Sequence, residues 1–133
     1  MFTYYPRQMA AHPILLEARQ ISSNQILMTY DKPTDLVSAT NVSNYWIRSN
    51  MGPDGIASVG MKDALTAGNA IRPDMGMIAP VDNSKMRFVI NFRVNVTRGV
   101  MYTVLPCFVN LEGMSGFMGE NWGPDSKNMF IGV

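Results

Sequence analysis

Residues 86–93 read MRFVINFR, and no other stretch of the chain says as much about its fold. Apolar side chains occupy every second position, and the positions between them carry Arg87, Val89, Asn91 and Arg93. A period of two places successive side chains on opposite faces of an extended chain, because neighbouring Cβ atoms of a strand point in opposite directions. The stretch therefore predicts an antiparallel strand with one face in a core and a mostly polar face in solvent.

Similar alternation recurs along the chain in short runs that turn residues separate. The side chains of Ile26, Met28 and Tyr30 fall on one face of their run, which we assign to the core. Pro33 ends this run, because proline has no backbone N–H for a sheet ladder. Residues 56–61 are expected to pair back as a hairpin on the preceding strand. Further strands are predicted at residues 14–21, 45–47, 101–109 and 128–133.

One short helix interrupts the strands. Thr34 and Asp35 are both N-cap residue types, so one or two helical turns are expected near residues 35–40. Residues 62–73 have a poor pattern and are expected to form a loop insertion with a short helix at 63–67. Many short strands with turns between them are typical of a sandwich. The predicted fold class is therefore all-β, an antiparallel two-sheet β-sandwich of about seven strands.

The composition fits one folded domain and excludes several classes of partner. With 47% hydrophobic and 16% charged residues, the chain is too apolar and too weakly charged to stay disordered. Lysine plus arginine number 11 against 10 acidic residues, so the chain lacks the large net positive charge that would attract nucleic acid. No run of about 18 or more apolar residues could span a membrane. The first residues also lack the basic start and apolar run of a secretory signal.

Few side chains in this sequence are candidates for catalysis or for metal binding. Cys107 is the only cysteine, so no intrachain disulfide can form and no zinc or iron–sulfur ligand set exists. A nucleophilic pair of Cys107 with His12 is the sharpest enzymatic alternative, but nothing in the sequence directs His12 toward the strand that carries Cys107. No closely spaced series of aspartates supplies the oxygens that calcium needs. We therefore predict no enzymatic activity, no catalytic residue, no cofactor and no metal site.

Three segments carry a resemblance to a known family. Residues 25–33 (QILMTYDKP) form an alternating strand that ends in a proline-containing turn, residues 38–47 (SATNVSNYWI) lead from helix to strand, and residues 96–104 (VTRGVMYTV) enter a strand through a glycine. In this order they resemble bacterial immunoglobulin-like (Ig-like) domains, which occur as repeats in S-layer and other cell-surface proteins. The resemblance covers about residues 14–113 and implies an Ig-like sandwich at the cell surface or in the extracellular space.

Three residues of these segments also suit a two-sheet sandwich on physical grounds. The phenol rings of Tyr45 and Tyr102 can fill a core between two sheets while their hydroxyls bond to backbone. Gly99 can supply the positive φ that a tight strand entry needs. The chain departs from the family pattern in an N-terminal arm at residues 1–13 and in a glycine-rich excursion with a final strand at residues 114–133.

Candidate site residues lie mainly in these departures. The arm contains an aromatic, β-prone run, and such a run can add a strand to an unpaired sheet edge of a neighbouring copy or fold back on its own domain. The predicted assembly residues are Phe2, Thr3, Tyr4, Tyr5, Phe130 and Ile131. Trp46 alternates away from its core-facing neighbours and Trp122 lies in the glycine-rich tail, so both are candidate ligand contacts, with burial against a loop as the alternative for each.

These observations predict a non-catalytic structural protein. It would be a self-associating Ig-like subunit of a bacterial surface filament, appendage or layer, with other copies of itself as its partners. The alternative is an adhesion or spacer module that binds a surface glycan or a protein through Trp46, Trp122 and the loops at residues 50–75. A head-to-tail contact that does not close on itself generates filaments, so the first hypothesis predicts large particles.

Overall fold

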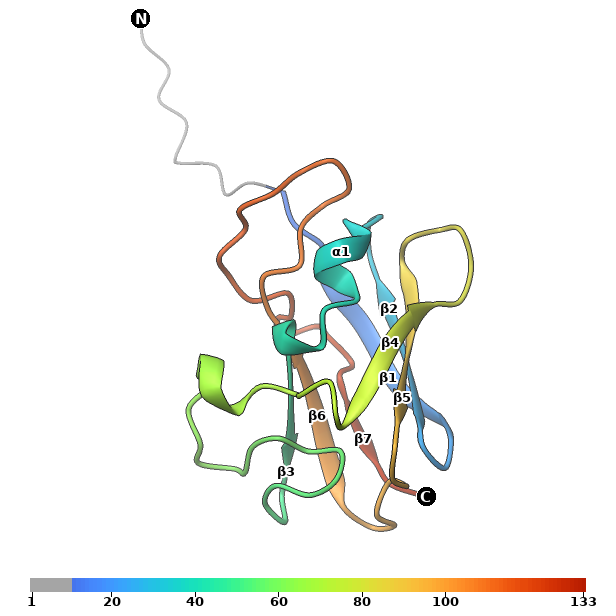
Figure 1. Ribbon diagram of the computed structural model, residues 1–133, viewed down its shortest axis with the longest axis vertical. Coiled ribbons are helices and arrows are strands. Elements are labelled where there is room, and N and C mark those ends of the chain that lie inside the picture. Colours follow the sequence, from blue (N-terminus) through green and yellow to red (C-terminus); the bar gives the residue numbers. More distant parts are fainter. Residues whose placement is uncertain (1–10) are drawn as a thin grey trace, which may run out of the picture.

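The computed structural model describes residues 11–133 and contains seven strands in two sheets (Figure 1). All strand pairs are antiparallel. The first sheet has the order β1 (Leu15–Ser22), β2 (Gln25–Tyr30), β5 (Arg87–Phe92) and β4 (Gly76–Pro80). The second has the order β3 (Tyr45–Ser49), β6 (Met101–Pro106) and β7 (Met129–Ile131). The predicted fold class is confirmed, and this strand order is that of a constant-type Ig sandwich.

Three short helical segments connect the strands. α1 (Leu36–Ala39) begins after Asp35, whose side chain accepts a hydrogen bond from the backbone N–H of Ser38 at 3.0 Å. The helix predicted near residues 35–40 is therefore confirmed, with Asp35 as its cap. It is followed by the 3₁₀ turn η1 (Val42–Asn44). The helix expected at residues 63–67 is wrong, because the helical turn of that loop is η2 (Ala67–Asn69).

The core between the sheets contains the side chains that the alternation selects. Ile26, Met28 and Tyr30 of β2 are fully buried. The β2–β5 register places Met28 opposite Phe88 and Ile26 opposite Ile90, so both strands present their apolar face to the same layer. The second sheet covers this layer with Tyr45, Ile47, Tyr102 and Val104, all with no exposed surface.

Tyrosine hydroxyls link this core to the polypeptide backbone, as predicted. The Tyr45 hydroxyl donates to the carbonyl oxygen of Ala39 in α1 at 2.6 Å and lies 2.6 Å from the Tyr30 hydroxyl. The Tyr102 hydroxyl accepts from the backbone N–H of Thr97 at 3.1 Å. Burial raises the pKa of Tyr30 and of Tyr45, so both hydroxyls stay protonated and able to donate.

Two segments differ from the strands that the sequence predicts. β4 was not predicted, although it pairs along its whole length with β5. Residues 56–61 do not form the predicted hairpin, because Val59 makes an isolated parallel bridge to Arg48 of β3. The backbone N–H of Ser58 donates to the carbonyl of Ile47 at 2.8 Å, so this segment runs along the outer edge of β3.

Candidate functional site

Three of the four sheet edges are covered. Backbone hydrogen bonds of 2.9 and 2.8 Å join Lys127 to Ala18 and Leu16 on the outer side of β1. The outer side of β7 faces β1, and the side chain of Gln20 bonds both the N–H and the carbonyl of Val133. The outer edge of β3 is covered by residues 58–59. Only the outer edge of β4 lacks such a cover within residues 11–133.

The backbone of β4 has free hydrogen-bonding groups along this edge. Met77 and Ala79 direct their N–H and carbonyl groups to β5, as the flanking bonds of Met75 and Val81 to β5 show. By alternation, the carbonyls of residues 76, 78 and 80 and the N–H groups of residues 76 and 78 point away from the sheet. In the described part of the chain no partner bonds the N–H of residue 76 or 78. We call this set of groups the β4 edge.

A groove runs beside the β4 edge. Thr40, Asn41 and Val42, which connect α1 to η1, form one wall, and β4 with Pro73 forms the other. The groove has a volume of about 390 Å³. Its apolar lining consists of Val42, Pro73, Met77 and Ile78, and Thr40 and Asn41 add polar atoms to the wall. We call it the edge groove.

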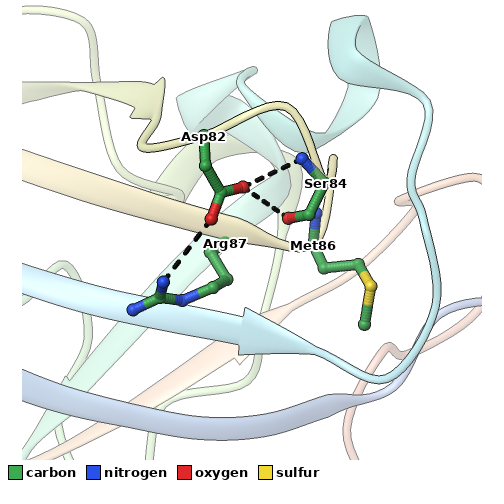
Figure 2. Close-up of polar contacts among 4 residues, drawn as sticks. All are labelled: Asp82, Ser84, Met86 and Arg87. Carbon is green, nitrogen blue, oxygen red and sulfur yellow. Dashed lines mark hydrogen bonds and ion pairs between the residues drawn. The ribbon is translucent and has the colours of Figure 1, made fainter.

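The turn that joins β4 to β5 defines where the open edge ends (Figure 2). The Asp82 carboxylate accepts hydrogen bonds from the backbone N–H and the hydroxyl of Ser84, at 2.9 and 2.5 Å. Its other oxygen lies 3.4 Å from the guanidinium of Arg87, and the Ser84 hydroxyl accepts from the N–H of Met86 at 3.0 Å. The bonds from Ser84, with a smaller effect of Arg87, hold the pKa of Asp82 below its ordinary value, so it remains an acceptor at neutral pH.

A second groove lies on the outer face of the other sheet. Trp46, Leu65, Phe108, Met118 and Glu120 are among its lining residues, and its volume is also about 390 Å³. Phe108 is 36% exposed, and its ring meets the ring of Trp46 edge-on, with 6.2 Å between ring centroids. We call it the aromatic groove.

The backbone of Phe108 is strained at this groove. Its φ of 65° lies in the left-handed region, which costs a non-glycine residue free energy because its Cβ crowds the following carbonyl. Its backbone N–H bonds the carbonyl of Gly119 at 2.9 Å, and the preceding residue, Cys107, bridges to Glu120. These contacts hold the exposed ring in place, and strain of this kind is concentrated at functional sites.

The two tryptophans occupy different environments. Trp46 points away from the inter-sheet core, as the alternation predicts, but the loop at residues 64–70 covers it and leaves 3% exposed. Its indole N–H donates to the carbonyl of Thr66 and the side chain of Asn69 at 3.0 and 2.8 Å. Trp122 is half-buried and packs against the buried cluster that contains Trp46, Val59 and Leu105. Trp46 contributes to the aromatic groove, and Trp122 does not line it.

The predicted assembly residues divide between two parts of the chain. Phe2, Thr3, Tyr4 and Tyr5 lie outside the described residues. Phe130 of β7 packs on the core, with its ring stacked on Tyr102 at 5.3 Å between centroids. Ile131, the next residue, is 58% exposed on the outer face of its sheet.

Cys107 and His12 have different surroundings. Burial raises the pKa of the Cys107 thiol to about 11, the charge of Glu120 adds to this increase, and the Trp122 indole N–H opposes it. A thiol with this pKa is protonated at neutral pH, whereas a nucleophilic cysteine requires the thiolate. The imidazole of His12 stacks on Phe117 with 4.1 Å between ring centroids.

Residues 11–133 contain neither a candidate membrane-spanning helix nor a candidate metal cluster. No helix in this range is long and apolar enough to cross a membrane. The same residues contain no group of three or more His, Cys, Asp or Glu side chains placed to hold a metal ion.

The fold is similar to parts of a bacterial surface-layer protein. The N-terminal part of the bacterial S-layer protein SbsC gives a TM-score of 0.56 and 17% identity over 84% of this chain and 23% of that chain. A structure of SbsC domains 1–6 gives a TM-score of 0.55 and 16% identity over 85% of this chain and 14% of that chain. Comparison with family models gives no match, and neither does comparison with curated proteins. The similarity establishes the fold, and this chain spans less than a quarter of the SbsC chains.

Proposed function

We propose that this chain is a non-catalytic structural subunit that self-associates at a bacterial cell surface, in a layer, appendage or filament. The observation that carries this proposal is the β4 edge, which is open within residues 11–133 while the other three sheet edges are covered. An uncovered edge is a template for pairing with another chain, and natural proteins usually protect such edges. The similarity of the fold to S-layer domains supports the surface location.

Assembly of the purified chain tests this proposal. Sedimentation velocity and negative-stain microscopy of the full chain are expected to show oligomers or filaments whose fraction rises with protein concentration. Removal of residues 1–10 is expected to reduce this fraction, because these residues contain the aromatic, β-prone run that is predicted to pair with a sheet edge of another copy. A full chain that stays monomeric across the concentration range refutes the proposal.

The aromatic groove favours a second candidate function, adhesion to a surface glycan or a protein. Its specific support is the exposed ring of Phe108, which a strained backbone holds over the groove. Aromatic faces with nearby polar groups are common in carbohydrate and protein contacts. Binding to a glycan array is expected to be lost in Phe108→Gly, a change that also tolerates the positive φ. Met61→Ala is a matched control, because Met61 is exposed and does not line the groove.

A further inference from the structure

We infer that the β4 edge receives residues 2–5 of a second copy of this chain as an added strand. The inference rests on the proposed self-association and names the contact that produces it. Added strands bind through backbone hydrogen bonds, and pockets for alternate side chains give them specificity. Both features are present at β4.

The backbone of β4 can bond a short strand. Two N–H groups, of Gly76 and Ile78, and three carbonyls, of Gly76, Ile78 and Pro80, point away from β5. Pro80 has no N–H, so the donors end before the turn. The run at residues 2–5, FTYY, is rich in β-forming residues and stops at Pro6. Donor and acceptor segments are thus both about four or five residues long, which is enough for one short strand.

The edge groove can receive side chains of such a strand. A residue that pairs with Ile78 places its side chain on the same face as Ile78, because paired residues share a face. That face opens into the edge groove, where Val42 and Ile78 provide apolar surface and Thr40 and Asn41 provide hydrogen-bonding atoms. Aromatic residues stand at positions 2, 4 and 5 of the arm. Either alternation therefore places at least one aromatic side chain in the groove.

The shape of the site favours a single extended segment over a second β4. The wall formed by residues 40–42 stands beside β4, and η1 contacts the strand. A β4 strand from another copy would bring its own wall into the same space. A segment with no flanking structure of its own passes between the wall and the strand.

The arm at residues 1–10 is long enough to reach a second copy. Ala11 lies beside Asn110 and residues 114–118, at the end of the sandwich where Ser38 of α1 bonds Asn110. Ten extended residues span about 33 Å, which is enough to reach a neighbouring domain of this size.

Disulfide trapping between two chains tests the pairing. Both chains carry Cys107→Ala, which removes the native thiol. The acceptor carries Met77→Cys, because Met77 is 68% exposed and directs its own backbone groups to β5, so it is a non-hydrogen-bonded position for an added strand. Cα atoms at such positions approach to about 4.5 Å, within the range of a disulfide. The donors carry cysteine at position 2, 3, 4 or 5, one at a time.

The expected result is one preferred position among the donors. Under mild oxidation, the donor position opposite Met77 is expected to give about tenfold more mixed dimer than the positions next to it. Adjacent side chains of a strand point to opposite faces, and a residue two positions away lies too far for a disulfide. Met51→Cys is the control acceptor, since Met51 is exposed and lies outside the edge groove. Circular dichroism of each variant checks that the sandwich is folded.

Three results would overturn the inference. One is a yield with Met77→Cys no higher than with Met51→Cys, and another is equal yields at all four donor positions. The third is a bond that forms only when both cysteines are in one chain, which identifies the chain's own arm as the occupant. Sedimentation of the unmodified chain separates the two proposals. If that chain assembles without trapping at β4, the contact lies elsewhere and self-association stands; if it remains monomeric and no trapping occurs, both fail.

Discussion

Tyr45→Phe is expected to destabilise the sandwich more than Tyr30→Phe, although the two hydroxyls form one buried pair. The single proton of the Tyr45 hydroxyl is used at the carbonyl of Ala39, 2.6 Å away. Tyr30 must therefore donate to Tyr45 across their 2.6 Å contact. Removing the Tyr45 hydroxyl leaves both the Tyr30 proton and the Ala39 carbonyl without a partner. Removing the Tyr30 hydroxyl leaves the bond to Ala39 intact.

The magnitudes follow from this direction of donation. A buried polar group without a partner costs about 1–3 kcal/mol, so the two groups orphaned in Tyr45→Phe cost about 2–6 kcal/mol. Tyr30→Phe loses one hydrogen bond and orphans no donor, which costs about 1 kcal/mol. In the double variant only the Ala39 carbonyl is orphaned. Its cost is therefore expected to fall below the sum of the single costs by about 2–4 kcal/mol.

Urea unfolding of the four proteins, followed by far-ultraviolet circular dichroism, measures these free energies. The slope m should stay constant, because neither substitution changes the surface exposed on unfolding by much. The reasoning is refuted if Tyr30→Phe costs as much as Tyr45→Phe, or if the two costs add within error. Either result would mean that Tyr30 does not donate to Tyr45 while Tyr45 donates to the carbonyl of Ala39.

Three further predictions concern buried polar groups. Burial raises the pKa of Tyr30 and Tyr45 above the ordinary value of 10.0, so the unfolded chain loses these protons at lower pH than the folded chain does. The free energy of unfolding is therefore expected to be constant up to about pH 10 and to fall above it by about 1.4 kcal/mol per pH unit per tyrosine. An unfolding midpoint that is constant from pH 8 to 11 would contradict this. The pKa of Cys107 is raised from 9.0 to about 11, so at pH 8 its thiol should react with a disulfide reagent about a hundredfold more slowly than in urea-unfolded protein. Equal rates in the folded and unfolded protein would show that the folded chain exposes Cys107 as a thiolate. The buried Asn121 amide accepts a hydrogen bond from the N–H of Val109 and donates to the carbonyls of Val109 and Pro13. Asn121→Leu is therefore expected to lower the free energy of unfolding, measured by thermal unfolding, by about 3 kcal/mol or more. A loss near zero would mean that water satisfies these groups in the variant.

The strands that could be predicted from the sequence are those whose two faces differ. β2 and β5 place apolar residues in the core and more polar ones outside, and this difference is a local property of the chain. β4 has no such signal, because its five residues include Gly76 and Pro80 and only Ile78 carries a large side chain into the core. Its strand conformation depends on pairing with β5, which is a tertiary contact.

Alternation also cannot specify which strand a segment pairs with, or in which direction. Residues 56–61 contain the apolar residues of a strand, with Ile56 and Val59 both fully buried. They were predicted to turn back on β3 as an antiparallel hairpin. Instead, the Asp54 carboxylate bonds the N–H groups of Ile56 and Ala57 at 2.8 and 2.7 Å, and the segment joins the edge of β3 in parallel.

The candidate sites were harder to predict than the fold. The outward direction of Trp46 follows from its position in β3, but its cover by residues 64–70 does not, because that loop has no periodicity. The aromatic groove depends on the positive φ of Phe108, and a phenylalanine gives no local sign of a left-handed conformation. The β4 edge could not be identified before β4 itself was known.

The open edge limits the kind of assembly that this sandwich can form. Long, flat edges pair without limit, and that leads to aggregation. Here the acceptor ends at Pro80 and the donor run ends at Pro6, so backbone pairing stops after a few residues at both. On the proposed contact, each copy gives one arm and receives one, through two different surfaces. Such heterologous contacts need not close on themselves, so the length of the assembly is set by concentration while each interface stays short and specific.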